Sequence, residues 1–258
     1  MALIEEMEQV GNVLFRWRSY LPFVMVPLFF SGLRYFSYPL GSHTLNQCWE
    51  LLCLAVSFTG LGVRIFTVGY TPKGTSGRNT KKQGADTLNT TGLYSVVRNP
   101  LYVGNFLIGL GVSLFVRVWW VSLIYLLAFM VYYERIIFAE EMYLRRKFGQ
   151  QFLDFASKTP AFLPRFKNWR SPDMSFSWRK VLRREYQTLF EIITIMFFME
   201  LFTEIHLGHN LKIDAMWVIL MAAGMMFYVI TRILYKLTSV LDDRPALQEP
   251  NNGIRPKK

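Results

Sequence analysis

Residues 92–104, with the sequence GLYSVVRNPLYVG, decide how the middle of this chain folds. Their polar half ends in Arg98 and Asn99, and an apolar run begins at Pro100. Proline disfavours the helical region at the residue before it but fits the first turn of a helix, so we expect Asn99 to be extended and a helix to begin at Pro100. Unpaired N–H groups and a partial positive charge at that helix start favour a carboxylate or a phosphate. One turn further, Gly104 would let a ligand approach the helix.

Apolar runs surround this stretch. The chain has 258 residues, of which 52% are hydrophobic and 16% aromatic, and this is rich for a soluble domain. A helix that spans a bilayer needs about 20 apolar residues. Candidate runs lie near residues 20–40, 48–69, 101–116, 118–138, 189–207 and 214–235. The sequence therefore predicts an all-α fold, a polytopic membrane helical bundle of about six transmembrane helices with a cytoplasmic-side cofactor pocket.

The basic residues are distributed unevenly between the loops. The chain has 29 Lys and Arg against 18 Asp and Glu. Sixteen of the basic residues fall in segments 71–99 and 139–188, whereas the loops on the other side hold only Arg34, Arg117 and Lys212. This is the positive-inside asymmetry, so we expect the basic face to meet anionic lipid head groups in the cytoplasm. The charge therefore indicates a membrane surface and not a nucleic acid.

Cysteine and histidine give no sign of a metal site or a disulfide. Cys48 and Cys53 lie five residues apart on one expected helix and do not face each other. The three histidines, His43, His206 and His209, have no metal-ligand spacing. We therefore expect no bound metal and interpret the cysteines as small apolar core residues.

The chain divides into three parts. They are residues 1–47, a lead-in and first span; 48–165, a core with the second span, a polar loop, a helical hairpin and an amphipathic helix; and 166–258, a basic linker with two additional spans. Two apolar runs joined only around Arg117 form the hairpin. The amphipathic helix is expected over residues 140–157. Prolines at 160 and 164 stop it.

Two adjacent glutamates, Glu140 and Glu141, follow the fourth apolar run. Carboxylates at a membrane border are costly and by default indicate function. In a hairpin, the end of the fourth run returns to the side on which the third run begins, at Pro100. The helix start would attract a carboxylate and the glutamates an ammonium, which fits the two ends of an amino acid group. The structural alternative is that the glutamates pair with Arg145 or Arg146 at helical spacing.

Four ordered motifs resemble the integral-membrane methyltransferase superfamily, which contains the isoprenylcysteine carboxyl methyltransferases and the phospholipid N-methyltransferases. The motifs are TGLY at 91–94, RNPLYVG at 98–104, EE-x2-L-x3-FG at 140–149 and P-x2-LP at 160–164. The resemblance covers about residues 48–165 and implies an enzyme that uses S-adenosylmethionine.

The resemblance also implies which residues hold this cofactor. A tetrad before the Thr-Gly-x-Tyr element falls on Asp86, Thr87, Leu88 and Asn89. The further cofactor positions, with the glycine of the first helical turn and the glutamate that contacts the donor, are Tyr94, Asn99, Pro100, Leu101, Tyr102, Gly104 and Glu140.

Departures from the isoprenylcysteine enzymes concern the acceptor. Those enzymes usually carry His at the positions of Asp86 and Asn99, whereas phospholipid-methylating relatives often have Asn before the proline. They also carry an acceptor-contacting Arg four residues before the first glutamate, where this chain has Ile136 with Arg135 adjacent. The resemblance therefore identifies the cofactor more closely than the acceptor.

Methyl transfer from a sulfonium needs alignment and exclusion of water. A carboxylate or phosphate acceptor needs only a cation to orient it, for which Arg64, Arg98 and Arg135 are candidates. An amine or thiol must also lose a proton, for which Glu141 or Tyr102 is the candidate base.

We therefore expect a cytoplasm-facing membrane methyltransferase that acts on a lipid-like or prenylated acceptor entering from the bilayer. O-methylation of a carboxylate or phosphate comes ahead of phospholipid N-methylation. The alternative from another class is a non-catalytic scaffold or transporter-like membrane protein, which predicts that side chains fill the space beside Asn99 and Glu140.

Overall fold

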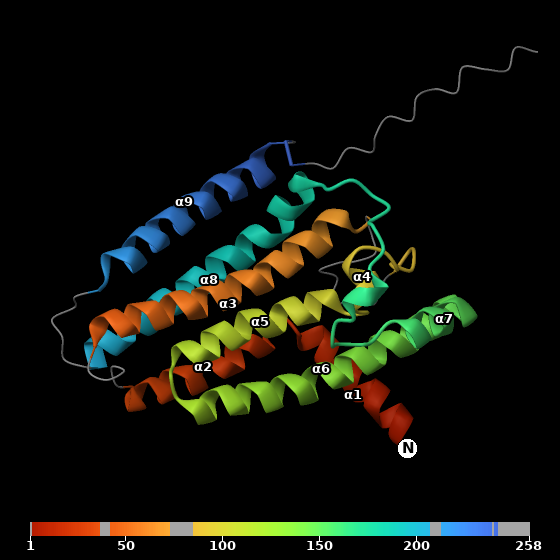
Figure 1. The fold of residues 1–258 in the computed structure, drawn as a ribbon, viewed down its shortest axis with the longest axis horizontal. Helices are drawn as coiled ribbons and strands as arrows, with labels where there is room; N and C mark the ends of the chain where they lie inside the picture. The colour runs from red at the N-terminus through yellow and green to blue at the C-terminus, as the bar shows by residue number, and fades with distance from the viewer. Residues whose placement is uncertain (1, 37–41, 73–84, 207–212, 239, 242–258) are drawn as a thin grey trace, which may run out of the picture.

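The computed structural model describes residues 2–36, 42–72, 85–206, 213–238 and 240–241. Helices make up 79% of it, and there is no strand among these residues. The helices and 3-10 turns are α1 Leu3–Trp17, α2 Leu21–Gly32, η1 Leu33–Tyr35, α3 His43–Tyr70, α4 Leu93–Val96, α5 Pro100–Phe115, α6 Trp119–Phe148, α7 Gln150–Lys158, η3 Phe166–Asn168, α8 Trp178–His206 and α9 Ala215–Leu237. Figure 1 shows the long helices side by side, with α9 at one edge, α6 at the other and α1 set obliquely against α6.

The predicted membrane helical bundle is confirmed. Three described helices are long and apolar enough to cross a membrane, namely α3, α6 and α9. Residues 23–35 and α5 are apolar but shorter. The fifth apolar run of the sequence lies in α8, which is not among the three and carries the buried carboxyl groups of Glu200 and Glu204. The six apolar runs are therefore all found in the helices of the bundle, but only half of them lie in helices that meet the length and composition of a span.

Helices α3 and α5 pack closely because glycines lie at their interface. A Cβ added at Gly60 would lie 2.5 Å from the carbonyl oxygen of Gly104, so these two backbones leave no room for a side chain. Further along, the Ser57 hydroxyl donates to the carbonyl oxygen of Ile108 at 3.0 Å. Small residues of this kind let membrane helices approach until their backbones touch. The contact fixes the side of α3 that carries Arg64 against the side of α5 that carries the motif.

The hairpin of α5 and α6 has the predicted form. Asn99 is non-helical, with φ −125° and ψ 61°, and Pro100 is the first residue of α5. Residues 116–118 connect the two helices, and Arg117 adopts a positive φ of 60°. A left-handed conformation is costly for arginine, so its side-chain contacts must hold this turn.

The expected independent amphipathic helix over residues 140–157 is replaced by two helical segments. Residues 140–148 continue α6, because nothing in the sequence breaks the helix after its apolar part. Gly149, with a positive φ of 53°, ends α6 and precedes α7. The glutamate pair thus lies within a continuous helix, and this fixes its orientation relative to the apolar part of α6.

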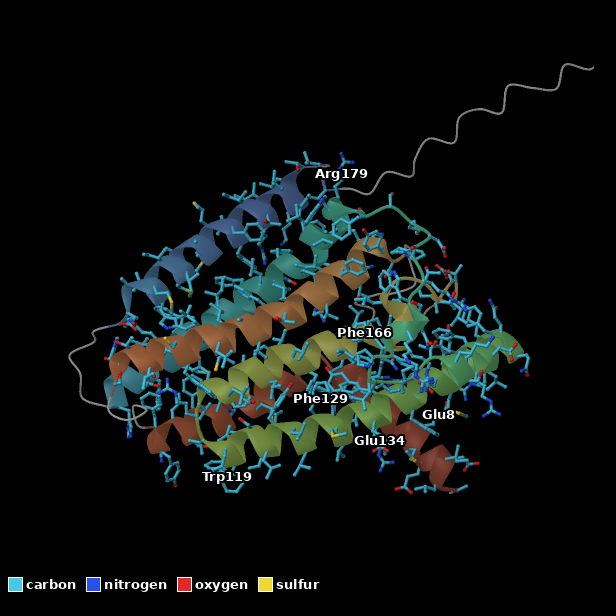
Figure 2. The ribbon with its side chains drawn as sticks, viewed as in Figure 1. Glu8, Trp119, Phe129, Glu134, Phe166 and Arg179 are labelled. Atoms are coloured by element: carbon cyan, nitrogen blue, oxygen red, sulfur yellow. The ribbon has the colours of Figure 1, made fainter. Side chains whose placement is uncertain are left out.

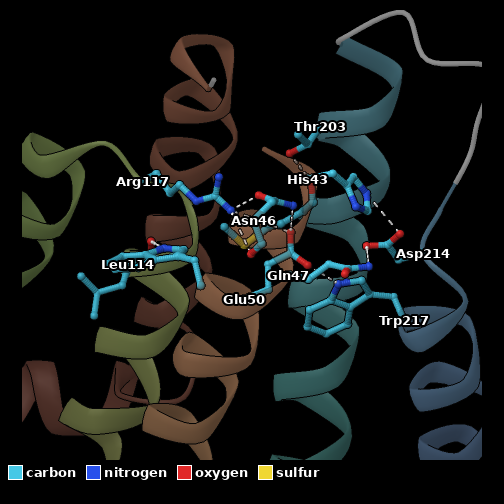
Figure 3. A network of polar contacts seen from close by, with 11 residues as sticks. His43, Asn46, Gln47, Glu50, Leu114, Arg117, Thr203, Asp214 and Trp217 are labelled. Carbon is cyan, nitrogen blue, oxygen red and sulfur yellow. Dashed lines mark hydrogen bonds and ion pairs between the residues drawn. The ribbon is translucent and has the colours of Figure 1, made fainter. Parts of the chain in front are cut away.

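A buried polar group closes the end of the bundle at which α3 and α9 begin (Figure 3). We call this group the end cluster, and it comprises Asn46, Glu50, Arg117, Glu200, Asp214 and Trp217. The Glu50 carboxylate accepts hydrogen bonds from Asn46 at 2.6 Å and from Trp217 at 2.9 Å. Arg117 donates to the Asn46 side chain and lies 4.0 Å from the Glu50 carboxylate. The end cluster therefore ties α3, the hairpin turn and α9 together.

Candidate active site

A cavity of about 1270 Å³ opens at the other end of the bundle, beside the start of α5. It extends from the polar residues around Glu140 to apolar side chains of α2, α5, α6 and α8, such as Phe29, Val112 and Ile192. Cavities for a single drug-sized ligand usually measure about 300–1,000 Å³. The space is therefore large enough for two ligands. Twelve of the fifteen predicted site residues line it, namely Arg64, Thr87, Leu88, Asn89, Tyr94, Arg98, Asn99, Pro100, Leu101, Tyr102, Glu140 and Glu141.

Glu140 lies at the polar end of the cavity. Its carboxyl group is hydrogen-bonded by the buried Tyr102 from the first turn of α5. Arg18, just after α1, lies 3.7 Å from the same carboxylate and stacks 3.9 Å from the ring of Phe15. Three helices thus meet at one carboxylate, and the arginine supplies the positive charge beside it.

The loop before the hairpin forms another side of this end. Thr87, Leu88 and Asn89 line the cavity, and Asn89 hydrogen-bonds the hydroxyl of Tyr94 in α4. Burial, followed by the nearby Glu140, raises the pKa of Tyr94 well above its usual value, so its hydroxyl keeps its proton at physiological pH. The same loop also borders a smaller cavity of about 200 Å³ on the side of Phe66 and Tyr70.

The segment after α7 holds the motif in place. The N–H of Arg98 donates to the carbonyl oxygen of Pro160 at 2.9 Å, and the side-chain amide of Asn99 donates to that of Ala161 at 3.1 Å. Arg165 donates to the carbonyl oxygen of Val96 at 3.0 Å. The proline motif at 160–164 therefore supports the RNPLYVG motif at 98–104. It contributes no residue to the cavity lining.

Arg98 and Glu141 form a two-pronged ion pair. The arginine donates to the two carboxylate oxygens at 2.8 and 3.1 Å. Its remaining terminal nitrogen donates to the carbonyl oxygens of Ala156 and Thr159 at 2.9 and 2.6 Å. The guanidinium thus fastens α6 to the end of α7. Of the two alternative partners expected from the sequence, Arg146 pairs instead with Glu8 of α1.

Deeper in the cavity, four side chains from four helices form a second polar group. We call it the polar belt, and it comprises Arg64 of α3, Asn105 of α5, Tyr133 of α6 and Glu185 of α8. Arg64 donates to the two oxygens of Glu185 at 2.8 and 2.9 Å. It also donates to the Asn105 side-chain oxygen at 2.5 Å, and the amide nitrogen of Asn105 donates to the Tyr133 hydroxyl at 3.0 Å. All four residues line the cavity.

Three predicted site residues lie away from the cavity wall. Asp86 is exposed at the start of the loop. Gly104 faces α3, where a Cβ would meet the Arg64 side chain and the carbonyl oxygen of Gly60. Arg135 lies where α1 crosses α6, with its carbonyl oxygen against Gly11. Gly104 therefore acts on the site by seating Arg64 between the helices.

The structure adds cavity residues that the sequence motifs do not identify. Arg18 and Glu185 come from segments before and after the motif region. Asn105 and Tyr133 lie inside it, one turn beyond Tyr102 and two turns before Glu140, respectively. A polar residue inside an apolar run was the only signal available for these two, and it does not distinguish a ligand contact from a packing contact.

Comparison with known proteins agrees with the motif region. Residues 51–151 match the model of the phospholipid methyltransferase family. This range includes most of α3, the loop, α4, the hairpin and the glutamate pair, but neither Arg18 nor Glu185. No solved structure matches the chain.

Two curated relatives are named as metal-resistance proteins. The cobalt-zinc-cadmium resistance protein CzcN of Cupriavidus metallidurans is 33% identical over 156 residues, which cover 60% of this chain and 64% of the relative. The nickel-cobalt-cadmium resistance protein NccN of Alcaligenes xylosoxydans xylosoxydans is 39% identical over 113 residues, which cover 43% of this chain and 50% of the relative. The chain therefore spans less than two thirds of either relative.

The motif region and the family match cover nearly the same residues. Both contain the helix start at Pro100 and the glutamate pair, although the motifs continue to Pro164 and the family match ends at residue 151. Residues 51–151 therefore match the phospholipid methyltransferase family, and the resemblance of the motifs to the integral-membrane methyltransferases is confirmed.

Proposed function

We propose that this protein transfers a methyl group from S-adenosylmethionine to an amphiphilic acceptor in the membrane. The observation that carries the proposal is a single cavity that joins the family's motif residues to an apolar interior. Methyl transfer needs space for a donor and an acceptor side by side. The cavity volume of about 1270 Å³ is large enough for a polar donor beside a lipid-like acceptor.

The residues at the polar end fit this cofactor. Glu140 offers a carboxylate to an ammonium group, and the start of α5 offers the positive end of its helix dipole to a carboxylate. Thr87, Asn89 and Tyr94 would hold the nucleoside part with hydroxyl and amide groups. When bound, the cofactor supplies an activated methyl group on a positively charged sulfur. The protein has to align that group with the acceptor and to exclude water.

The side-chain contacts of the arginines change which acceptor the site favours. Arg64 and Arg98 were candidates to orient a carboxylate or phosphate, but each is held by a glutamate through two hydrogen bonds. Arg135 does not line the cavity. O-methylation of a carboxylate or phosphate therefore loses its main support, and N-methylation becomes at least as well supported. Glu141 as a base meets the same difficulty, because Arg98 holds it.

The orientation in the membrane follows from charge. The motif end of the bundle carries the basic segments that the positive-inside rule places in the cytoplasm. The polar end of the cavity would then face the cytoplasm, where the cofactor is made, and the apolar part would lie within the bilayer.

A non-catalytic scaffold is less well supported. Such a protein would keep the hairpin for packing and would fill the space beside Asn99 and Glu140 with side chains. Both residues instead line the large cavity.

The names of the relatives raise metal handling as a second candidate role. Among the described residues, ligand oxygens of Glu50, Glu200 and Asp214 lie within 4.8 Å of one another. Asn46 and Trp217 already occupy the two Glu50 oxygens, and the Arg117 cation lies 4.0 Å away. A divalent cation would have to displace these contacts, so methyl transfer remains the better supported function.

Incubation of membranes with methyl-labelled S-adenosylmethionine tests the proposal. Membranes that contain the protein should transfer label to extractable lipid, and membranes with the Glu140→Gln variant should not. Mild alkali then separates the two acceptor classes, because it releases volatile label from a carboxyl ester but not from nitrogen. Equal labelling by the wild type and by membranes without the protein would refute the proposed activity.

A further inference from the structure

The charges that line the cavity are balanced. Its described lining includes four arginines and four glutamates, which are Arg18, Arg64, Arg98, Arg184, Glu140, Glu141, Glu185 and Glu191. Three of the arginines each face a glutamate within 3.7 Å. The remaining two residues add one charge of each sign. Without a bound donor, the protein therefore adds no net charge that would balance a charged head group, and an unbalanced charge is costly to bury in a partly apolar space.

The polar belt nevertheless offers a hydrogen bond. Arg64 donates to Asn105, so the Asn105 side-chain oxygen is an acceptor and its amide nitrogen is the donor to Tyr133. The Tyr133 hydroxyl receives that bond, which leaves its own proton to be donated. The ring of Tyr133 is stacked on Phe129, with centroids 4.1 Å apart, and this fixes the position of the hydroxyl. Figure 2 shows Phe129 on the inner side of α6.

Helix α8 supplies the wall opposite Tyr133. Five of its ten cavity-lining residues recur every three or four positions and form one stripe along the helix, with Glu191 and Thr194 beside it. The stripe begins with polar residues such as Glu185 and Thr188 and continues with the apolar Ile192, Ile195 and Phe198. A polar region followed by an apolar one matches the head and the chain of an amphiphile.

The apolar part of the cavity also reaches the outer surface of the bundle. Phe23 of α2 and Phe198 of α8 line the cavity but are 68% and 46% exposed. Above them, Phe30 of α2 meets Phe202 of α8 with ring centroids 5.2 Å apart. Helices α2 and α8 thus contact each other through Phe30 and Phe202. The aromatic side chains of Phe23 and Phe198 lie at the rim of the cavity. An apolar chain that enters there meets the α8 stripe first.

We infer that α8, which lies outside the matched family segment, forms the acceptor subsite, and that this subsite selects an amphiphile with an uncharged, hydrogen-bond-accepting head group. The Tyr133 hydroxyl reads the head group, and the Arg64–Glu185 pair keeps the belt neutral. This inference rests on the proposed function, because it assigns the acceptor side of the same cavity. Tyr133 and Glu185 are thereby specificity-determining and positioning residues, respectively.

Binding of matched probes tests the inference without any methyl transfer. The full-length protein, purified in detergent, is incubated with dodecanol, dodecanoate or dodecyltrimethylammonium, and occupancy is measured by native mass spectrometry. Dodecanol should bind best. Tyr133→Phe should weaken dodecanol binding by about three- to tenfold, the loss of one hydrogen bond, and should leave the two charged probes unchanged. Tyr186→Phe is the matched control, because Tyr186 packs on Tyr228 of α9 and does not line the cavity.

A charge variant gives the sharper result. Glu185→Gln leaves the Arg64 cation without its carboxylate, so the preference should shift from dodecanol to dodecanoate by about tenfold or more. Preference of the wild type for either charged probe would overturn the inference, as would a Tyr133→Phe variant that binds dodecanol normally. If Glu185→Gln does not fold, the Tyr133 comparison decides alone.

Titration with S-adenosylhomocysteine separates the two proposals. Binding of this demethylated product by the wild type and by Tyr133→Phe, together with an unchanged probe ranking, would contradict only the acceptor subsite. Absence of product binding with the expected probe ranking would contradict the proposed function and leave a neutral-amphiphile site.

Discussion

The cavity and the end cluster both hold buried charged side chains, yet they use them in different ways. In the end cluster, the Glu50 carboxylate has partners on both oxygens and its residues lie outside the cavity lining. In the polar belt, the Arg64–Glu185 pair borders open space, and the Tyr133 hydroxyl retains a proton to donate. Burial of charge alone therefore does not identify a site. Buried charged groups whose hydrogen-bond partners all come from the protein indicate a structural role. A hydrogen-bond donor directed into a cavity indicates a ligand-binding role.

Neither the end cluster nor the polar belt is expected to add much stability to the fold. A buried ion pair loses nearly as much by desolvation as it gains by attraction, but removal of one partner is strongly destabilising. In the end cluster, the contacts hold the left-handed turn at Arg117 and connect helices that are distant in sequence. In the cavity, the same kind of contact keeps arginine and glutamate side chains in fixed positions around a space.

The largest effect is expected at Glu140, where loss of charge should weaken cofactor binding. Glu140→Gln takes away a carboxylate that can hold an ammonium group, so affinity for S-adenosylhomocysteine should fall roughly tenfold to a hundredfold. Isothermal calorimetry measures this directly. Glu134→Gln is the matched control, because Glu134 is exposed on the same helix and points away from the bundle (Figure 2). Similar affinities for the two variants would place the cofactor elsewhere.

Substitution of Arg98 tests whether this cation has a structural role or binds a ligand. Its guanidinium makes four hydrogen bonds to α6 and the end of α7, which a lysine cannot reproduce although it keeps the charge. Arg98→Lys should therefore lower the free energy of unfolding by about 2–3 kcal/mol. Thermal unfolding in detergent measures the change. A stable variant with weakened acceptor binding would show that Arg98 belongs to the ligand site.

Trp217 tests the structural role of the end cluster. Trp217→Phe removes the indole donor to Glu50 and leaves a buried carboxylate oxygen without it, at a cost of about 1–3 kcal/mol. Trp119→Phe is the control, because Trp119 is 76% exposed and lies on the outside of the bundle (Figure 2). Affinity for S-adenosylhomocysteine should be unchanged in both. A loss of affinity in Trp217→Phe would mean that the end cluster and the cavity are coupled.

The smallest effect concerns the surface ion pair between Arg146 and Glu8, with nitrogen–oxygen distances of 2.5 and 2.9 Å. The Arg146 hydrogen bond lowers the pKa of Glu8 from 4.5. A lowered pKa in the folded state gives stability that is present above pH 4.5 and is lost as the pH falls through the folded value. Arg146 is 58% exposed, so the pair contributes less than about 1 kcal/mol. The stability difference between wild type and Glu8→Gln should shrink below pH 4.5, and a constant difference would show that the pair contributes nothing.

The sequence predicts the framework of the fold well because its signals are local. Proline at the start of α5, the short connection at Arg117 and the apolar runs each act through backbone geometry or burial within one segment. The prediction of a separate helix over residues 140–157 is wrong because an amphipathic surface pattern does not by itself break a helix that precedes it. Gly149 provides the break, nine residues later than expected.

The sequence predicted the residues of the candidate site only where they belong to a motif. The motif residues around Asn99 and Glu140 do meet at one cavity. Arg18 and Glu185 reach that cavity from segments about 80 residues away on either side of the helix start at Pro100, and no local pattern encodes such a meeting. The pairing of Arg64 with Glu185 was likewise invisible in the sequence, and it changes the expected acceptor from an anion to a neutral head group.

Calorimetric titration of the purified wild-type protein with S-adenosylhomocysteine tests the central claim most directly. The account predicts saturable binding to one site per chain that is weakened roughly tenfold to a hundredfold in Glu140→Gln and retained in Glu134→Gln and Trp217→Phe. Absence of binding to the wild type, or binding that survives Glu140→Gln at full affinity, would contradict the assignment of this cavity as the methyl-donor site.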